Sequence, residues 1–171
     1  MSLGHLVRRL LGSLSRRRPG EDDQAWVAAR LLVGEQELWA RLGPADQRHL
    51  LAVARRVEAD LGPAATRPVL AAALLHDVGK LASHLSTYGR VVATLSIKAA
   101  GRDTADAWTE TQGFTRRVGL YAQHEALGAD MLALAGSDPL TVALVREHAW
   151  DPSERTTPAA PADALRRADD A

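Results

Sequence analysis

Cysteine is absent from this 171-residue chain, and aromatic residues make up only 4% of it. Without cysteine, a disulfide framework and a thiolate zinc site are both excluded. The longest unbroken apolar run, residues 69–75, is seven residues long, far shorter than a helix that crosses a bilayer. Lysine plus arginine equals aspartate plus glutamate at 21 each, so no global charge favours binding to nucleic acid.

The residues that do occur favour helices throughout. Alanine, leucine and arginine dominate, and no stretch sustains the alternation typical of a half-buried strand. A chain of this length is expected to form one domain with a sizeable core. We therefore predict an all-α fold, with helices near residues 3–14, 22–32, 35–42, 45–61, 66–78, 87–100, 115–135, 138–149 and 160–170.

His76 and Asp77 are the most informative pair of residues, because they directly follow the apolar run 69–75. An imidazole and a carboxylate at a position that the pattern predicts to be buried are normally paired with each other or bound to a metal. The pair alone fits a hydrogen-bonded couple inside a core as well as a metal site. The positions of the other histidines distinguish these two interpretations.

Several polar residues continue an inward-facing row of a helix. Residues four apart share a helix face, and the residue four positions before each candidate is alanine or leucine. The candidates with this property are His49, His76, Asp77, His124, His148 and Asp169. The clearest row comprises Leu120, His124, Leu127, Met131 and Leu134, which we expect to form one buried face.

So many inward imidazoles and carboxylates cannot all be satisfied core residues in a protein of this size. They lie about 20 to 50 residues apart, which predicts a metal site assembled from different helices of a bundle. Neutral imidazole with carboxylate suits Fe, Mn, Zn, Co or Ni. The remaining histidines, His5 near Arg8 and His84 four residues after Lys80, are predicted to be solvated.

Together these residues resemble the HD-domain superfamily of metal-dependent phosphohydrolases, whose ligands follow the order H…HD…H…H…D. The sequences around the ligands also resemble those of the superfamily, with Leu-Leu-His-Asp-Val-Gly-Lys at 74–80 and His-Glu-Ala-Leu-Gly-Ala-Asp-Met at 124–131. The resemblance covers residues 36–171 and is closest to short stand-alone bacterial HD proteins. It implies an HD domain at 35–171, a helical bundle with a metal site at its centre, after an N-terminal basic amphipathic segment at 1–34.

The resemblance also assigns the ligands. His49, His76, Asp77 and Asp169 would hold one divalent transition metal ion. Asp77 would bridge to a second ion, completed by His124 and His148, so two ions are expected. Asp169 is preferred to Asp170 as the last ligand, because Asp170 lies four residues after Arg166 on what is predicted to be the outer face.

The implied activity is hydrolysis of a nucleotide or other small phosphoester by metal-activated water, without a covalent nucleophile from the protein. Lys80 and Arg48, each close to a ligand in sequence, are the candidate catalytic residues for contact with a substrate phosphate. The alternative for both is a solvated side chain. Residues 81–120 are longer than a connection needs and are expected to form a wall or lid of the pocket.

Two other functions fit the same residues. A non-catalytic regulatory module of this superfamily would bind a nucleotide or a partner without turnover, but such modules usually lose ligands, and here the set is complete. A di-iron oxygenase of the superfamily uses the same ligands and is the less favoured alternative.

Residues 1–20 carry five arginines and no acidic residue, with leucine and valine at helical spacing at positions 3, 6, 7, 10, 11 and 14. Such a segment binds an anionic membrane surface or a partner protein, packs on its own domain, or forms a disordered tail. Arg8 and Arg9 interrupt the apolar stretch, so we expect no signal peptide and a cytoplasmic protein.

Overall fold

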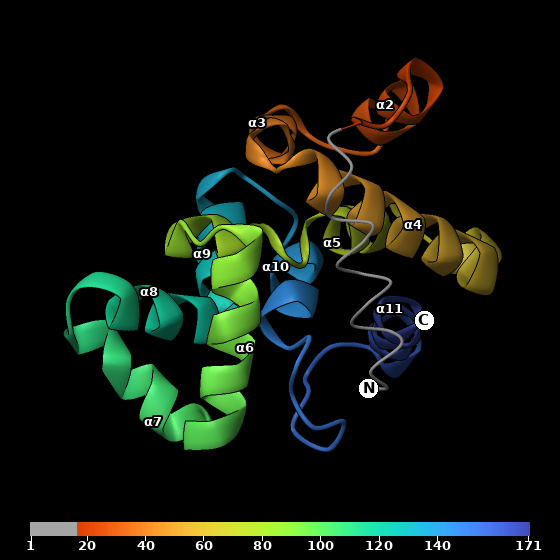
Figure 1. Ribbon diagram of the computed structural model, residues 1–171. Helices are drawn as coiled ribbons and strands as arrows, with labels where there is room; N and C mark the ends of the chain where they lie inside the picture. The colour runs from red at the N-terminus through yellow and green to blue at the C-terminus, as the bar shows by residue number, and fades with distance from the viewer. Residues whose placement is uncertain (1–16) are drawn as a thin grey trace.

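The computed structural model describes residues 17–171, and every regular element in this range is a helix, with no strand (Figure 1). The all-α prediction is therefore confirmed. The predicted basic helix at 3–14, with His5 and most of the proposed membrane or protein contact at 1–20, lies outside the described residues. No helix among the described residues has the length and apolar character needed to cross a bilayer.

The described helices follow one another with mostly short connections, and the longest one, residues 147–158, joins α10 to α11. The α-helices are α2 (Glu21–Ala28), α3 (Val33–Arg41), α4 (Pro44–Leu61), α5 (Arg67–Leu75), α6 (Thr87–Ala100), α7 (Arg102–Ala107), α8 (Gly113–Ala122), α9 (His124–Leu134), α10 (Pro139–Arg146) and α11 (Ala159–Asp170). Three 3₁₀ helices, η1 (Gly62–Ala64), η2 (Val78–Ser83) and η3 (Trp108–Glu110), connect some of them.

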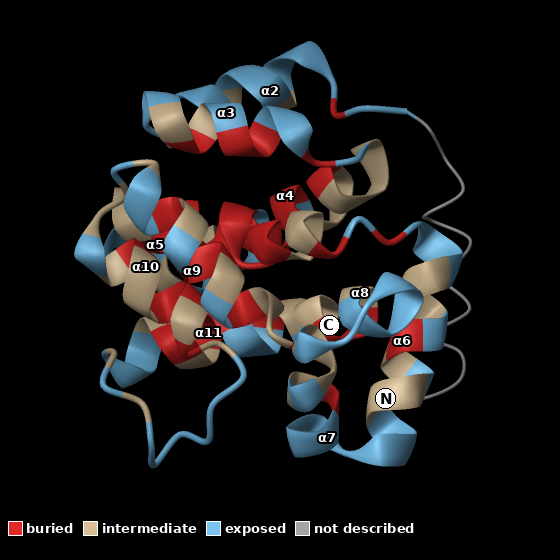
Figure 2. Cartoon of the chain, turned by 90° about the vertical axis from the view of Figure 1, so that its left-hand side faces the viewer, coloured by how far each residue is buried: buried red, intermediate tan, exposed pale blue. Residues whose placement is uncertain are grey.

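Helix α5 lies at the centre of the main core (Figure 2). All its residues from 69 to 75 are buried, as expected for a helix that is apolar on every side. Helices α4 and α10 pack against α5, and α11 packs against α4. Val27 and Leu31 also belong to this core. The predicted boundary between residues 34 and 35 lies within α3, and the division into two domains stays a prediction.

A second, smaller core holds α6, α7, η3 and α8 together. Its buried residues are Leu85, Ala93 and Val118. This unit packs on the rest of the protein mainly by contact of its helix α8 with η2. In addition, the Arg90 guanidinium in α6 binds both carboxylate oxygens of Asp46 in α4, at 2.8 and 2.9 Å. The segment that we predicted to be a wall or lid is thus a small helical unit beside the main core.

The structure corrects the predicted single helix at 115–135. The helix is interrupted at Gln123, where φ is −97° and ψ is 17°, so that α8 ends at Ala122 and α9 begins at His124. The predicted buried row is also wrong, because Leu134 is 90% exposed. The buried face of α9 instead comprises Glu125, Gly128, Ala129 and Leu132.

Close packing of α9 on η2 explains which face of α9 is buried. A Cβ atom on Gly79 would lie 1.9 Å from the carbonyl oxygen of His124 and 2.5 Å from the nitrogen of Gly128. The two backbones therefore approach so closely that only small residues fit between them. A leucine at position 128 would hold the two elements apart, which is why a glycine faces η2 at this point of α9.

Other boundaries differ less. Helix α5 ends at Leu75 and α10 at Arg146, so His76, Asp77 and His148 lie in the turns that follow these helices rather than within them. Helix α7 and η3 were not predicted, because residues 102–110 are mostly polar and show no apolar periodicity.

We predict that Gly79→Ala destabilises the protein by about 1–3 kcal/mol, because the new methyl group must displace backbone of α9 rather than a flexible side chain. Urea unfolding of both proteins measures the difference. Gly20→Ala is the matched control, since a Cβ atom there meets nothing within 4 Å. Equal losses in the two variants would contradict the close contact between η2 and α9.

Candidate metal centre

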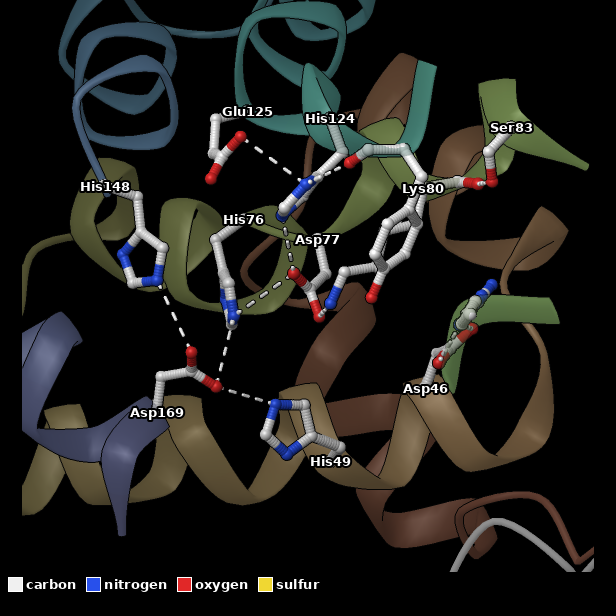
Figure 3. A network of polar contacts seen from close by, with 12 residues as sticks. Asp46, His49, His76, Asp77, Lys80, Ser83, His124, Glu125, His148 and Asp169 are labelled. Carbon is white, nitrogen blue, oxygen red and sulfur yellow. Dashed lines mark hydrogen bonds and ion pairs between the residues drawn. The ribbon is translucent and has the colours of Figure 1, made fainter. Parts of the chain in front are cut away.

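All six predicted ligands face one region of the structure, where several helices end (Figure 3). His49 lies within α4, His76 and Asp77 in the turn after α5, and His124 at the start of α9. His148 follows the end of α10, and Asp169 lies in the last turn of α11. The structure thus brings together residues that are up to 120 positions apart in the sequence.

Asp169 contacts three imidazoles. Its Oδ1 atom lies 2.9 Å from Nε2 of His49 and 3.6 Å from Nε2 of His76, and its Oδ2 atom lies 3.5 Å from Nε2 of His148. The neighbouring Asp170 is exposed. The helical register therefore places Asp169, not Asp170, among the histidines, as the sequence predicted.

Asp77 is surrounded by positive or hydrogen-bonding groups. Its Oδ1 atom lies 3.8 Å from Nε2 of His76 and 3.6 Å from Nε2 of His124, and its Oδ2 atom accepts a hydrogen bond from Nζ of Lys80 at 2.5 Å. Lys80 reaches Asp77 from the first turn of η2, three residues away. Lys80 therefore belongs to this cluster and is not a solvated lysine.

Hydrogen bonds to main-chain carbonyls orient two of the imidazoles. Nδ1 of His76 donates to the carbonyl of Ala73 at 3.0 Å, and Nδ1 of His124 donates to the carbonyl of Tyr121 at 2.8 Å. In each neutral ring this leaves the lone pair on Nε2, which faces the carboxylates. Fixing the tautomer in this way is typical of histidines that bind metals.

The donor atoms fit a metal ion. Nε2 of His76 is buried and has no hydrogen-bond partner among the described residues, although it faces both carboxylates. Ligand atoms about 2.1 Å from an ion are about 3.0 to 3.4 Å from each other in octahedral or tetrahedral geometry. The cluster's nitrogen–oxygen distances of 2.9 to 3.8 Å to Asp169 and Asp77 come close to this range.

Two overlapping sets of ligand atoms are close enough to share an ion: His49, His76 and Asp77, and His76, His148 and Asp169. His76 is common to both, so they describe one centre. His124 contacts Asp77 but belongs to neither set.

Both carboxylates are held in the charged form. Burial opposes the charge of Asp77, but Lys80 and His76 outweigh it, and the pKa of Asp77 lies well below its usual range. Burial likewise opposes the charge of Asp169, but the surrounding imidazoles of His148, His49 and His76 together outweigh it and hold its pKa far below the ordinary value. Burial alone would lower the pKa of Lys80, but the charge of Asp77, the contributions of Tyr121 and Asp169 and the hydrogen bond to Asp77 together outweigh burial and raise it.

Two residues that support the cluster were not predicted. Glu125 is buried, with Oε2 3.4 Å from Nδ1 of His124 and 2.8 Å from a guanidinium nitrogen of Arg102. The ring of Tyr121 stacks on that of His124, with centroids 5.6 Å apart. A signal for Glu125 existed, because Gly128, Ala129 and Leu132 lie three, four and seven residues after it on one helix face.

The remaining candidates lie elsewhere. Arg48 is half-buried, and its guanidinium donates a hydrogen bond to the main-chain carbonyl of Arg17. A role of Arg48 in substrate contact stays a prediction. His84 is exposed at the end of η2, with a left-handed φ of 49°, in agreement with the solvated position expected for it.

Comparisons of this chain with protein-family models, with curated proteins and with solved structures find no match. The resemblance to the HD superfamily therefore rests on the residue pattern alone.

We predict that Asp169→Asn lowers the affinity for a divalent transition metal at least about 10-fold, because the amide loses the charge that faces three imidazoles. Asp170→Asn is the matched control and is expected to change the affinity little, since Asp170 is exposed. Calorimetric titration with Mn²⁺ or Zn²⁺ compares the two variants. A larger effect at Asp170 would mean that Asp169 is not a ligand.

Proposed function

We propose that this chain is a metal-dependent phosphohydrolase that acts on a nucleotide or another small phosphoester. The observation that carries the proposal is the buried Nε2 atom of His76, which has no hydrogen-bond partner among the described residues and faces Asp77 and Asp169. A structural His–Asp couple would satisfy this nitrogen with a direct hydrogen bond, whereas the contacts here are 3.8 and 3.6 Å long.

In this proposal His49, His76, Asp77 and Asp169 hold a divalent transition metal. When bound, such an ion supplies a water of lowered pKa and neutralises charge on the phosphoryl group. The residue pattern favours two ions, with Asp77 between them. Lys80 contacts the same carboxylate, so its position affects how many ions can bind.

The protein side chains contribute charge and orientation. The carboxylates of Asp77 and Asp169 stay ionised, because Lys80 and the surrounding imidazoles lower their pKa values. The imidazoles must be neutral to bind a metal, so acidification should weaken binding. Tyr121, which lies under Lys80 and beside His124, provides an aromatic surface next to the cluster.

We predict that the purified wild-type protein retains divalent metal after supplementation with Mn²⁺, Fe²⁺ or Zn²⁺ and releases phosphate or a nucleotide from at least one phosphoester. Asp77→Ala should lose most of the metal and the activity, because Asp77 contacts both His76 and His124. Elemental analysis and a panel of nucleoside monophosphates, dinucleoside polyphosphates and nitrophenyl esters provide the two measurements.

Asp60→Asn is the control for this experiment, since Asp60 is a surface carboxylate paired with Arg167. A wild-type protein that stays metal-free under all three supplements would overturn the proposed centre. Metal binding without turnover of any phosphoester would instead favour a regulatory, nucleotide-binding role. Consumption of oxygen by the iron form would favour the oxygenase alternative.

A further inference from the structure

The ammonium group of Lys80 lies inside the cluster of predicted ligands (Figure 3). Its Nζ atom is 2.5 Å from Oδ2 of Asp77, and its side chain is only 16% exposed. The backbone of Lys80 is also held, because its nitrogen donates to the carbonyl of Asp77 at 3.0 Å and its carbonyl accepts from Oγ of Ser83 at 2.7 Å. Lys80 is therefore directed at Asp77 by the geometry of η2.

The two oxygens of Asp77 have different neighbours. Oδ1 faces the Nε2 atoms of His76 and His124, whereas Oδ2 faces Lys80. A carboxylate that bridges two metal ions through both of its oxygens presents one oxygen to each ion. The Lys80 ammonium stands where an ion on Oδ2 would have to bind.

The histidines expected to complete a second ion do not form a separate group with Asp77. His148 turns toward Oδ2 of Asp169 at 3.5 Å, and its ring lies 4.8 Å from that of His76. Among the described residues, both sets of mutually close ligand atoms include His76. The donors thus converge on one position rather than two.

The charge of the cluster also favours a single metal ion. Asp77 and Asp169 provide two negative charges, and the ion pair between Lys80 and Asp77 already offsets one of them. One divalent ion is enough to neutralise what remains. A second ion would have to lie beside an ammonium group in a largely buried site, where like charges repel strongly.

We propose that Lys80 takes the place of a second metal ion on Asp77, so that the centre binds a single divalent ion. This inference rests on the proposed metal centre. Lys80 thereby acts as a fixed cation next to the ion, and His124 acts on Asp77 as a positioning residue rather than as a ligand.

The experiment measures metal stoichiometry by elemental analysis after Mn²⁺ or Zn²⁺ loading and removal of unbound ions. The wild-type protein should bind one equivalent per chain. Lys80→Met, which keeps the length of the side chain but removes its charge, should bind two. Lys80→Arg should restore one equivalent. Lys98→Met, at the chain's other lysine, is the control and should also bind one, because Lys98 is exposed in α6.

His124→Ala in the wild-type background gives a second measurement that does not depend on the folding of Lys80 variants. It should leave the single ion in place, whereas the same change in Lys80→Met should reduce two equivalents to one. Electron paramagnetic resonance of the Mn²⁺ forms distinguishes an isolated ion from a coupled pair.

The outcomes separate this inference from the proposed function. A wild-type protein without metal would overturn both. Two equivalents in the wild type, or loss of the ion in His124→Ala, would overturn the role of Lys80 and leave the metal centre standing. One equivalent in both the wild type and a folded Lys80→Met would show that Lys80 does not limit the number of ions.

Discussion

The carboxylate of Asp77 lies at the end of a fully buried helix, and much of the surrounding structure follows from the need to compensate its charge. An uncompensated ion in such a position costs several kcal/mol. Lys80, His76 and His124 provide the compensation, and they reach Asp77 because η2 turns directly after α5 and packs on α9. The close approach of Gly79 to α9 is the steric condition for this arrangement.

Asp169 provides the second carboxylate from the far end of the chain. Helix α11 packs on α4, and this contact brings Asp169 to His49. Because His76 and His148 lie in turns after α5 and α10, three otherwise separate elements converge on one carboxylate. The centre therefore depends on the packing of the whole main core, and small shifts of α11 would change all three contacts.

The smaller helical unit contributes to the centre from its side. Tyr121 stacks on His124, and Arg117 donates a hydrogen bond from Nε to the carbonyl of Ser83 in η2 at 3.0 Å. The Arg90–Asp46 ion pair joins α6 to the helix that carries His49. These contacts join the unit to His124 and η2 on one side and to α4, which carries His49, on the other, without adding a ligand to the cluster.

The sequence alone determined the all-helical fold, the buried position of α5 and the inward orientation of His49 and Asp169, because all of these depend on local composition and on spacing within one helix. The tertiary structure decided the break at Gln123, the close contact of Gly128 with η2, the burial of Glu125 and the pairing of Lys80 with Asp77. The row with Leu127, Met131 and Leu134 and the row with Glu125, Gly128, Ala129 and Leu132 both satisfy helical periodicity. Which row is buried depends on how closely a distant segment approaches, and helical spacing carries no information about that distance.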